Sequence, residues 1–518
     1  MVEQDTTYTA LVSSFKQKLR IKAKALYRIM PDGSEMLLQT DGDVTGLPSG
    51  CIVVGSTTAA AATSTTATAS AAASTPAGAS SSSTPQISAG NGDSASASSS
   101  GNTDNSLLTQ HAANVDVTYS PVPKLAPHQH LAAQLAAPSI RVLADKSWTD
   151  DDAVKQLHQV AASLEDVVFA VGLPDLHVSK GFPVGTAFAT RSIVYPALIG
   201  DDIGCGMALF KTEMQSKHAH KADKWLNKLH DLDRAYQGED VPRWLREFDV
   251  EPTEHDAACL GTIGGGNHFA ELQQVERVEN RELFAQLGMT EESLYLLVHS
   301  GSRGFGRAVL SRHLDTLGAV GVAQGSPACE TYLKSHDHAC RWARCNRAII
   351  ANRFLDALNT SGTQILDIWH NSVARTPLVD GSSCWLHRKG AAPADKGPVV
   401  IPGSRGAFSY LVMPTSNADA QEFGGYSLAH GAGRKWARSK ALAVGKSRFP
   451  QPSALTTTPL GSHVVCEDKQ LLYEEAPDAY KEISDVVDDL QSKNLIQVVA
   501  VMRPVISYKT RANEHPHK

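Results

Sequence analysis

A histidine at position 430 stands between small residues, in the segment Gly424-Gly-Tyr-Ser-Leu-Ala-His-Gly-Ala-Gly-Arg434. The glycines at 431 and 433 have no Cβ atom, so a bulky charged ligand can approach the imidazole and the neighbouring backbone N–H groups. Arg434 adds a positive charge that can hold a triphosphate. These surroundings suit a histidine nucleophile, although a lone histidine is more often a packed or surface residue than a catalyst.

A second group of side chains is suited to binding divalent cations. Asp202 and Cys205 lie three residues apart and follow the apolar stretch 193–199, so we expect them at the end of a strand. A thiolate can bridge two ions, and a carboxylate beside it favours manganese over zinc. The alternative for Cys205 is a small buried hydrophobic residue with no chemical role.

Three histidines could complete such a site. His268, His299 and His370 each follow a glycine turn or end an apolar, strand-like run. Neutral imidazole is a common ligand of first-row metals, and a pair of ions needs about five or six protein ligands. The three histidines together with Asp202 and Cys205 make five. Their spacing is too long to form a readable motif, so this grouping depends on the fold.

Another cysteine grouping, His336 with Cys340 and Cys345, has a spacing that superficially suits zinc. The stretch from Cys340 to Leu358 has helical spacing, and residues five apart on a helix point in different directions. We therefore expect no structural zinc at this position.

The chain has 518 residues, a formal net charge of −6 and 20% charged residues. This length suits about three average domains or one large α/β enzyme with a tail. Because there is no global positive field, a nucleic acid would be held by local clusters. We expect phosphate contacts from Arg303, Arg388, Lys389 and Arg405, with ordinary solvated charges as the alternative.

The eight cysteines form no paired framework, which indicates a reducing compartment. The first residues are acidic, and no apolar run approaches the ~20 residues of a membrane span. We expect a soluble intracellular protein without a membrane partner, in the cytoplasm, with the nucleus as the alternative.

The composition divides the chain into three segments. Residues 56–105 are almost wholly Ala, Ser, Thr, Gly and Pro, which predicts a disordered linker. Residues 1–55 contain two alternating stretches around a Pro-Asp-Gly turn and a third apolar stretch, which predicts a small β-rich module. This module resembles the second half of a doublecortin or ubiquitin-like module, and a partly ordered extension is the alternative. Residues 106–518 would form the catalytic domain.

The third segment has the pattern of an α/β (α+β) protein. Residues 153–163 have helical spacing after an acidic start at 150–152, and residues 166–172 have the pattern of a buried strand. Farther along, strands and Gly-rich loops alternate with helices. Polar residues fall at the expected strand ends, where such enzymes place their sites.

From about Val142 to Lys509 the chain resembles the RtcB-type RNA ligases, and the shared motifs occur in the family's order. The matching stretches are Leu173-Pro-Asp-Leu-His177, Asp202-Ile-Gly-Cys205, Gly265-Gly-Asn-His-Phe269, His299-Ser-Gly-Ser-Arg-Gly304, Ala351-Asn-Arg353, His370-Asn371, His387-Arg-Lys-Gly-Ala391, Ile401-Pro-Gly-Ser404, Ser409-Tyr410, His430-Gly-Ala-Gly-Arg434 and Ala479-Tyr-Lys481. The resemblance implies that family's compact catalytic fold. It also implies a GTP- and Mn²⁺-dependent ligase that joins RNA 3′-phosphate or 2′,3′-cyclic phosphate ends to 5′-hydroxyl ends, in RNA repair or in RNA splicing and tRNA processing.

The resemblance also assigns roles to residues. His430 would become guanylylated, and Asp175 would fix its tautomer. Two Mn²⁺ ions would share the Cys205 thiolate. One ion would also take His299 and His370, and the other Asp202 and His268. The residues expected to bind the guanine nucleotide are Asn267, Glu271, Arg303, Ser404, Ser409, Gly431, Ala432, Gly433, Tyr480 and Lys509.

Two positions depart from the usual family pattern. Gly204 and Ala208 stand where mainstream members usually carry Asn and Arg, and this segment looks more like the branch called release-factor-H-coupled. The departures affect the expected RNA substrate more than the expected activity, because every metal and nucleophile position is kept.

Two other functions stay open on the sequence. A metal-dependent cyclic phosphodiesterase or phosphatase that does not ligate would need the metal ligands but not His430. A non-catalytic RNA-binding protein, with the N-terminal module recruiting a protein partner, would need neither.

Overall fold

The computed structural model describes residues 25–29, 35–38, 52–56 and 138–511. The chain divides into two compact units, 1–109 and 110–518, and each is described by itself. In the first unit, the described strands β1 (Ala25–Ile29), β2 (Glu35–Leu38) and β3 (Ile52–Ser56) form an antiparallel sheet in the order β2-β1-β3. The predicted linker at 56–105 lies outside the described residues after Ser56. The separate N-terminal module stays a prediction.

The larger sheet of the second unit has the hydrogen-bonded order β12-β8-β10-β9-β20-β17-β16, with β19 beside β20. All these neighbours are antiparallel except β19 and β20. The strands are β8 (Gly206–Gln215), β9 (Phe269–Val278), β10 (Ser293–Ser300), β12 (Gly362–Trp369), β16 (Val399–Pro402), β17 (Ser409–Pro414), β19 (His463–Cys466) and β20 (Ile496–Thr510).

A second sheet has the order β13-β14-β6-β5-β4, in which only β4 and β5 are parallel. Its strands are β4 (Ser139–Val142), β5 (Val167–His177), β6 (Val184–Thr190), β13 (Asn371–Pro377) and β14 (Ser383–Lys389). Two short pairs are β7 (Ile193–Val194) with β11 (Val322–Ala323), and β15 (Ala391–Pro393) with β18 (Ser427–Ala429). The predicted buried strand at 166–172 is confirmed as the first half of β5.

The helices of the described part complete a mixed α/β fold. They are α3 (Asp151–Ser163), α4 (Ala222–Leu226), α5 (Val241–Glu247), α6 (Asp256–Cys259), α7 (Arg281–Gln286), α8 (Arg303–Leu317), α9 (Pro327–Ala357), α10 (Ala418–Phe423), α11 (Arg438–Arg448), α12 (Lys469–Glu474) and α13 (Ile483–Ser492). Helix α3 confirms the predicted helix, and the Asp150 side chain caps it by accepting from the Asp152 N–H group.

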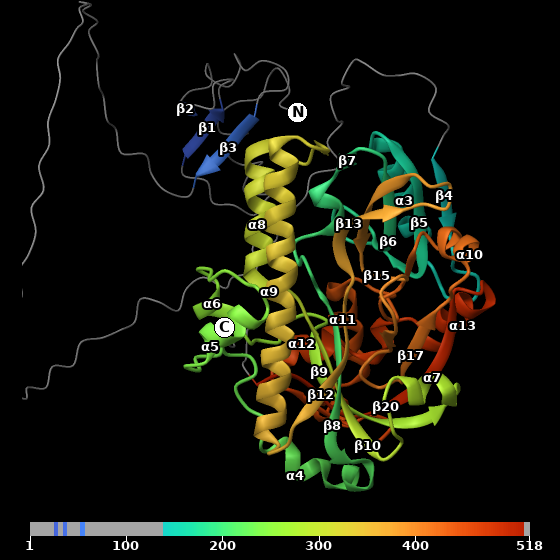
Figure 1. Ribbon diagram of the computed structural model, residues 1–518. Helices are drawn as coiled ribbons and strands as arrows, with labels where there is room; N and C mark the ends of the chain where they lie inside the picture. The colour runs from blue at the N-terminus through green and yellow to red at the C-terminus, as the bar shows by residue number, and fades with distance from the viewer. Residues whose placement is uncertain (1–24, 30–34, 39–51, 57–137, 512–518) are drawn as a thin grey trace, which may run out of the picture. The chain divides into compact units, whose positions relative to one another are not determined.

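Helix α9 is longer than the sequence predicts. The spacing predicts a helix only from Cys340, yet the helix begins at Pro327, where the Ser326 side chain caps it. It lies beside α8 and packs against β8 and β10 of the larger sheet (Figure 1).

The predicted strand over residues 193–199 is wrong. Only Ile193 and Val194 are extended, and Pro196 begins a short 3₁₀ helix that ends at Ile199. Proline has no N–H group to donate to a ladder and fixes its own φ, so it ends the strand. Asp202 and Cys205 therefore do not follow a strand. They lie in the turn that leads into β8.

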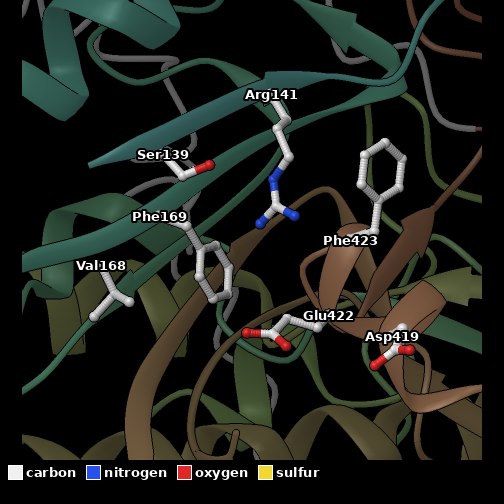
Figure 2. Close-up of a pocket in the computed structure, with 7 residues that line it drawn as sticks. All are labelled: Ser139, Arg141, Val168, Phe169, Asp419, Glu422 and Phe423. Atoms are coloured by element: carbon white, nitrogen blue, oxygen red, sulfur yellow. The ribbon is translucent and has the colours of Figure 1, made fainter. Parts of the chain in front are cut away.

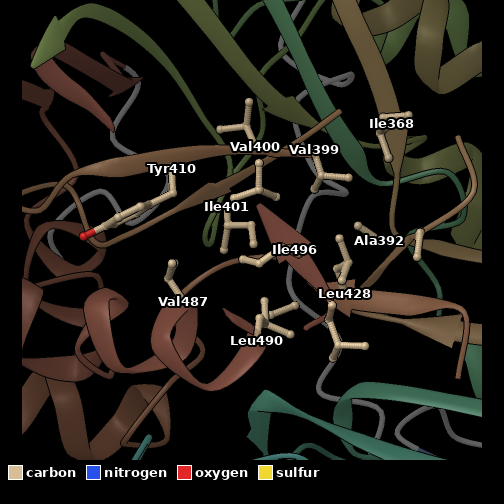
Figure 3. Packing of buried hydrophobic residues seen from close by; sticks show 14 of the residues in the cluster. Ile368, Ala392, Val399, Val400, Ile401, Tyr410, Leu428, Val487, Leu490 and Ile496 are labelled. Atoms are coloured by element: carbon tan, nitrogen blue, oxygen red, sulfur yellow. The ribbon is translucent and has the colours of Figure 1, made fainter. Parts of the chain in front are cut away.

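The main apolar core is shared by the two sheets. Its buried residues come from β5 and β6, from β8, β10 and β12, and from β16, β17, β20 and α13. Figure 3 shows part of this core, where Val487 and Leu490 of α13 face Ile401 of β16. Burial of this apolar surface holds the sheets together and fixes the relative positions of their edges.

A buried ion pair lies between helix α9 and the larger sheet. Arg347 is fully buried, and its guanidinium donates twice to Asp367 Oδ1, at 2.9 and 2.6 Å. The same side chain donates to the carbonyl oxygens of Gly204 and Ser300, at 2.8 and 2.9 Å. One side chain thus joins α9 to the ends of β8, β10 and β12.

We expect Arg347→Met to destabilise the fold by about 3–5 kcal/mol, because it leaves the Asp367 carboxylate buried without its cation. Chemical denaturation measures this loss. The control is Arg344→Met, since Arg344 is partly exposed and its Nε lies 3.8 Å from Asp367. That change should cost no more than about 1 kcal/mol. Equal losses for the two variants would contradict the role given to Arg347.

Candidate metal and nucleotide site

Four neighbouring strands of the larger sheet bring side chains of the predicted metal site to one edge. In the order β12-β8-β10-β9, neighbours run antiparallel, so the end of one strand lies beside the start of the next. His370 follows β12, Cys205 precedes β8, His299 lies near the end of β10, and His268 precedes β9. The four side chains therefore meet, although 165 residues separate Cys205 from His370 in the sequence.

The contacts within this group are short. Cys205 Sγ lies 3.3 Å from His268 Nε2 and 3.3 Å from His299 Nε2, and the Cys205, His268 and His299 donor atoms can all reach one metal ion. The His370 and His299 rings are 5.2 Å apart. Asp202 Oδ2 lies 2.9 Å from His268 Nε2. The structure thus brings the five predicted ligands together.

The donor set fits divalent cations. Asp202 Oδ1 is buried and has no hydrogen-bond partner among the described residues, so it can serve as a ligand. His268 Nδ1 lies 3.0 Å from the carbonyl oxygen of Ile263, which fixes the tautomer with Nε2 facing Cys205 and Asp202. One sulfur, one carboxylate and three imidazoles match the preferences of a first-row metal.

Burial controls the protonation of this group. Desolvation and the neighbouring histidines hold the pKa values of His299 and His370 well below their usual range, so both rings are neutral and able to bind a metal. Burial and the Asp202 carboxylate raise the pKa of the Cys205 thiol well above its usual value. A cation between these donors would favour the thiolate.

The glycine before Cys205 is required by its surroundings. Gly204 has a φ of +74°, and a Cβ atom there would lie 2.9 Å from Cys340 Cα on α9. Asparagine also tolerates this left-handed backbone, which explains why both residue types suit the position. In this chain the close approach of α9 leaves space only for glycine. Ala208, the second departure, is fully buried in the core cluster under α9 and points away from the ligands.

His430 lies beside the metal-binding group. It follows β18, whose partner β15 begins next to His370, and the His430 and His370 rings are 4.7 Å apart. His430 Nδ1 lies 2.6 Å from Asp175 Oδ2, and the His430 backbone N–H donates to the same oxygen at 3.1 Å. Asp175 is fully buried on β5. The carboxylate thus holds Nδ1–H and leaves the Nε2 lone pair free.

The small residues after His430 matter mainly because they leave room for the neighbouring backbone. Gly433 has a φ of +72°, and a Cβ atom there would lie 2.3 Å from the carbonyl oxygen of Asp175. Only glycine allows this approach of the two segments. The Ala432 N–H donates to the carbonyl oxygen of Pro402 at 3.0 Å and is therefore already occupied.

Lys481 fixes the strand that carries Asp175, a role that the sequence did not indicate. Its buried Nζ donates to the carbonyl oxygens of Pro174 and Leu176, both at 2.8 Å, on either side of Asp175. Burial lowers the pKa of Lys481 to about 8.

The predicted nucleotide residues Glu271, Ser409 and Lys509 lie on adjacent strands of the larger sheet. The Glu271 carboxylate accepts from Ser507 and, at 2.8 Å, from Gln273, which also donates to Ser409 Oγ at 2.9 Å. Burial raises the pKa of Glu271 to about 7. Lys509 Nζ donates to the carbonyl oxygen of His268 at 2.9 Å, which links this group to the predicted metal ligands.

The remaining predicted nucleotide residues lie in loops around these strands. Asn267 is half-buried in the turn before His268, and Ser404 is half-buried in the loop between β16 and β17. The Arg303 guanidinium covers Gly264, and its Nη1 lies 3.5 Å from His268 Nδ1. Arg303 therefore lies behind a predicted metal ligand.

The expected phosphate contacts are partly wrong. Arg388 is buried and donates to Ser427 Oγ and to the carbonyl oxygen of Tyr426, so it is a core residue. Lys389 donates to the carbonyl oxygen of Phe182 at 2.7 Å. The nearby Gly390 suggests an exposed loop, but both residues belong to β14, where Arg388 is buried and Lys389 is half-buried.

His336, Cys340 and Cys345 are not among the described residues whose donor atoms lie close enough together to share one metal ion. His336 and Cys340 lie in the core beside Tyr332, whereas Cys345 lies in a separate cluster with Trp342. His336 Nε2 accepts from the Val373 N–H at 3.1 Å, which occupies that nitrogen.

A cavity of about 400 Å³ lies elsewhere, between the edge strand β4, β5 and α10 (Figure 2). In it the Arg141 guanidinium lies 5.4 Å from the Phe169 ring and 5.5 Å from the Phe423 ring. It contains none of the predicted site residues.

Comparisons with known proteins show which family the chain resembles. The family model described as "tRNA-splicing ligase RtcB" matches residues 156–243 and 226–510. RNA-splicing ligase RtcB2 of Escherichia coli is 43% identical over 373 residues, covering 71% of this chain and 94% of that protein. The tRNA-splicing ligase RtcB of Archaeoglobus fulgidus is 29% identical, covering 69% and 90%.

RNA-splicing ligase RtcB1 of E. coli is 28% identical, covering 70% of this chain and 97% of that protein. Of the two E. coli proteins, RtcB2 is therefore the more similar, which agrees with the departures at Gly204 and Ala208. In the part of the chain that the structure describes, no helix combines the length and apolar character needed to cross a membrane.

We expect Cys205→Ala to lose most bound Mn²⁺, because the sulfur lies between two imidazole ligands and would be shared by both ions. His299→Ala should weaken mainly one ion. Metal analysis after dialysis measures both effects. Cys329→Ala, a change at a buried cysteine outside the site, is the control and should keep the wild-type content. Two ions retained by the Cys205 variant would contradict the shared ligand.

Proposed function

Because the chain belongs to the RtcB family of RNA ligases, we propose that it is a GTP- and Mn²⁺-dependent ligase with His430 as its nucleophile. It would join RNA 3′-phosphate or 2′,3′-cyclic phosphate ends to 5′-hydroxyl ends, in RNA repair or tRNA processing. The enzyme would act in the cytoplasm or nucleus, and a recruiting protein partner is compatible with the N-terminal module.

One observation carries this proposal. The buried Asp175 carboxylate holds His430 at Nδ1, and the His430 ring lies 4.7 Å from the His370 ring of the metal-binding group. A structural histidine has no need of both an orienting carboxylate and a neighbouring ligand cluster. The arrangement supports a nucleophile that attacks a phosphate held by cations.

The first step would form a histidine–GMP bond. His430 Nε2 attacks the α-phosphorus of GTP, a P–N bond forms, and pyrophosphate leaves with the electrons of the broken P–O bond. Asp175 stabilises the positive charge that develops on the ring, because its oxygen accepts from Nδ1–H throughout. Lys481 keeps Asp175 in place through the carbonyl groups on either side of it.

The second and third steps would transfer the GMP and release it. An RNA 3′-phosphate oxygen attacks the phosphorus and frees His430, after hydrolysis of a cyclic end where one is present. The 5′-hydroxyl of the other RNA end then attacks the activated 3′-phosphorus, and GMP leaves as the phosphodiester forms.

The metal ions would be held by the five ligands of the strand edge. Cys205 would be shared, with His299 and His370 on one side and Asp202 and His268 on the other. When bound, the ions supply positive charge for the triphosphate and for the attacking and leaving oxygens. The protein contributes their positions, the neutral state of the imidazoles and a largely buried site.

We expect His430→Ala to lose all transfer of label from α-labelled GTP to the protein, with Mn²⁺ content unchanged, because no metal ligand is removed. Asp175→Asn should slow labelling by up to about 10⁴-fold, since an amide can set the wrong tautomer and carries no charge. Denaturing gels after incubation with GTP and Mn²⁺ measure both variants. The bond should be labile to acid and stable to alkali.

The same experiment separates the ligase from a hydrolase. Wild-type protein that opens 2′,3′-cyclic phosphate ends but is never labelled would favour the metal-dependent phosphodiesterase. Full labelling of the His430 variant would place the nucleophile elsewhere.

A further inference from the structure

Three cationic side chains gather around one carboxylate beside the nucleotide residues. Arg434 Nη1 lies 2.9 Å and Arg438 Nε 3.7 Å from Glu475 Oε1, and Lys509 is close enough to interact electrostatically with the same group. The Glu475 side chain is only 3% exposed. These cations hold the pKa of Glu475 down, at about 2, against the effect of burial. The carboxylate is therefore ionised at every working pH.

Glu475 also holds the Tyr480 ring. The Tyr480 hydroxyl donates to Glu475 Oε2, and the Arg434 guanidinium lies 5.1 Å from the centre of the Tyr480 ring. One carboxylate thus fixes a phenol at its oxygen and a guanidinium against its ring. The position of Tyr480, a predicted nucleotide residue, depends on both contacts.

Arg434 stabilises this arrangement through hydrogen bonds to the protein. Besides its bond to Glu475, its Nε donates to the carbonyl oxygen of Trp436 at 3.0 Å and its Nη2 to that of Glu474 at 2.8 Å. Each nitrogen of the guanidinium already donates to the protein, so Arg434 does not match the sequence-based expectation of a free triphosphate contact.

Arg438 is the cation that faces outward. Its side chain is 51% exposed, and a Cβ atom on Gly266 would lie 2.5 Å from its Nη2. Arg438 therefore lies over the turn that carries Asn267 and His268. Glu475 restrains the Arg438 guanidinium at Nε, and the guanidinium lies beside the turn that leads to the predicted metal ligand His268.

The segment from Glu475 to Lys481 connects these groups to the nucleophile. The Lys435 N–H donates to the carbonyl oxygen of Ala479 at 2.7 Å, and the Lys481 N–H to that of Gly433 at 3.0 Å. The loop after His430 is thereby hydrogen-bonded to the backbone on either side of Tyr480.

We propose that Glu475 is the positioning residue of the nucleotide site, holding Tyr480, Arg434 and Arg438 in the geometry that guanylyl transfer to His430 requires. The inference rests on the proposed ligase function. No contact of Glu475 with the nucleotide is needed, because it acts through the three side chains that it binds.

This role predicts a specific kinetic pattern. Glu475→Gln keeps the shape of the side chain but removes its charge, so the cluster becomes more positive while its members lose their common anchor. The cluster still attracts the triphosphate of GTP, but the side chains no longer align the nucleotide for attack by His430. We expect the guanylylation rate at saturating GTP to fall on the order of 10- to 100-fold, with the KM for GTP changed by less than about 3-fold.

The experiment compares single-turnover labelling of Glu475→Gln, Tyr480→Phe and the double variant over a range of GTP concentrations. Tyr480→Phe keeps the ring and removes only the hydroxyl contact, so its loss should be smaller. The double variant should be no slower than Glu475→Gln, because both changes break one interaction. Glu474→Gln is the matched control. Its carboxylate accepts from Gln470 and only its backbone meets Arg434, so labelling should stay at the wild-type rate.

Calorimetry with inorganic tripolyphosphate gives a measurement that does not depend on catalysis. Glu475→Gln should bind it at least as tightly as the wild-type protein, because one negative charge has been removed from the cluster. Four results would each overturn the proposal. Two of them concern Glu475→Gln alone: a wild-type labelling rate, or a rise in the KM for GTP without a fall in the rate. The others are fully additive losses of rate in the double variant and markedly weaker binding of tripolyphosphate by Glu475→Gln. If Glu475→Gln does not fold, a wild-type labelling rate in Tyr480→Phe overturns it. If wild-type protein is never labelled, the proposed function fails and the tripolyphosphate comparison still tests Glu475.

Discussion

Arg347 reaches from the middle of α9 into the larger sheet, and the candidate site depends on what it binds there. Its guanidinium holds the Asp367 carboxylate and the carbonyl oxygens of Gly204 and Ser300. These three residues stand next to, or within three residues of, Cys205, His299 and His370. A buried cation with satisfied donors is costly to move, so it fixes the ends of three strands relative to one another.

The strand order then determines the chemistry of the edge. Antiparallel neighbours alternate in direction, so ligands that precede β8 and β9 meet ligands at the ends of β10 and β12. Burial of the same edge keeps the histidines neutral, which a metal ligand requires. A parallel sheet would have placed the residues before β8 and β9 at the opposite edge from those at the ends of β10 and β12.

His430 follows the short pair β15–β18, and Asp175, whose carboxylate holds it, comes from the second sheet. Asp175 is carried by β5, and the loop after His430 is paired with residues 479–481. Because the main core is shared by both sheets, packing of ordinary apolar residues sets the separation between His430 and the edge that carries the predicted metal ligands. The close approach of Gly433 to Asp175 completes this arrangement.

The sequence by itself determined the chemical types of the site. It indicated His430 among small residues, five candidate metal ligands, and motifs whose order indicates the ligase family. Helix α3 and the first half of β5 were also predictable, because their periodicity is local. Pro196 is a local signal too, and it explains why the strand predicted over residues 193–199 ends at Val194.

Only the tertiary structure decided which charged groups serve the site. Arg388 lies two residues before Gly390 and Arg434 follows Gly433, yet their donors are used within the protein. Glu475 had no local signal, and the motif Ala479-Tyr-Lys481 did not indicate a role for Lys481, although these two side chains hold Tyr480 and Asp175. A side chain's role follows from the partners it meets. The partners of Arg388 and Lys481, and the Glu474 partner of Arg434, lie 38 to 307 residues away in the sequence. Such contacts depend on strand order, register and core packing, which no short stretch of sequence contains.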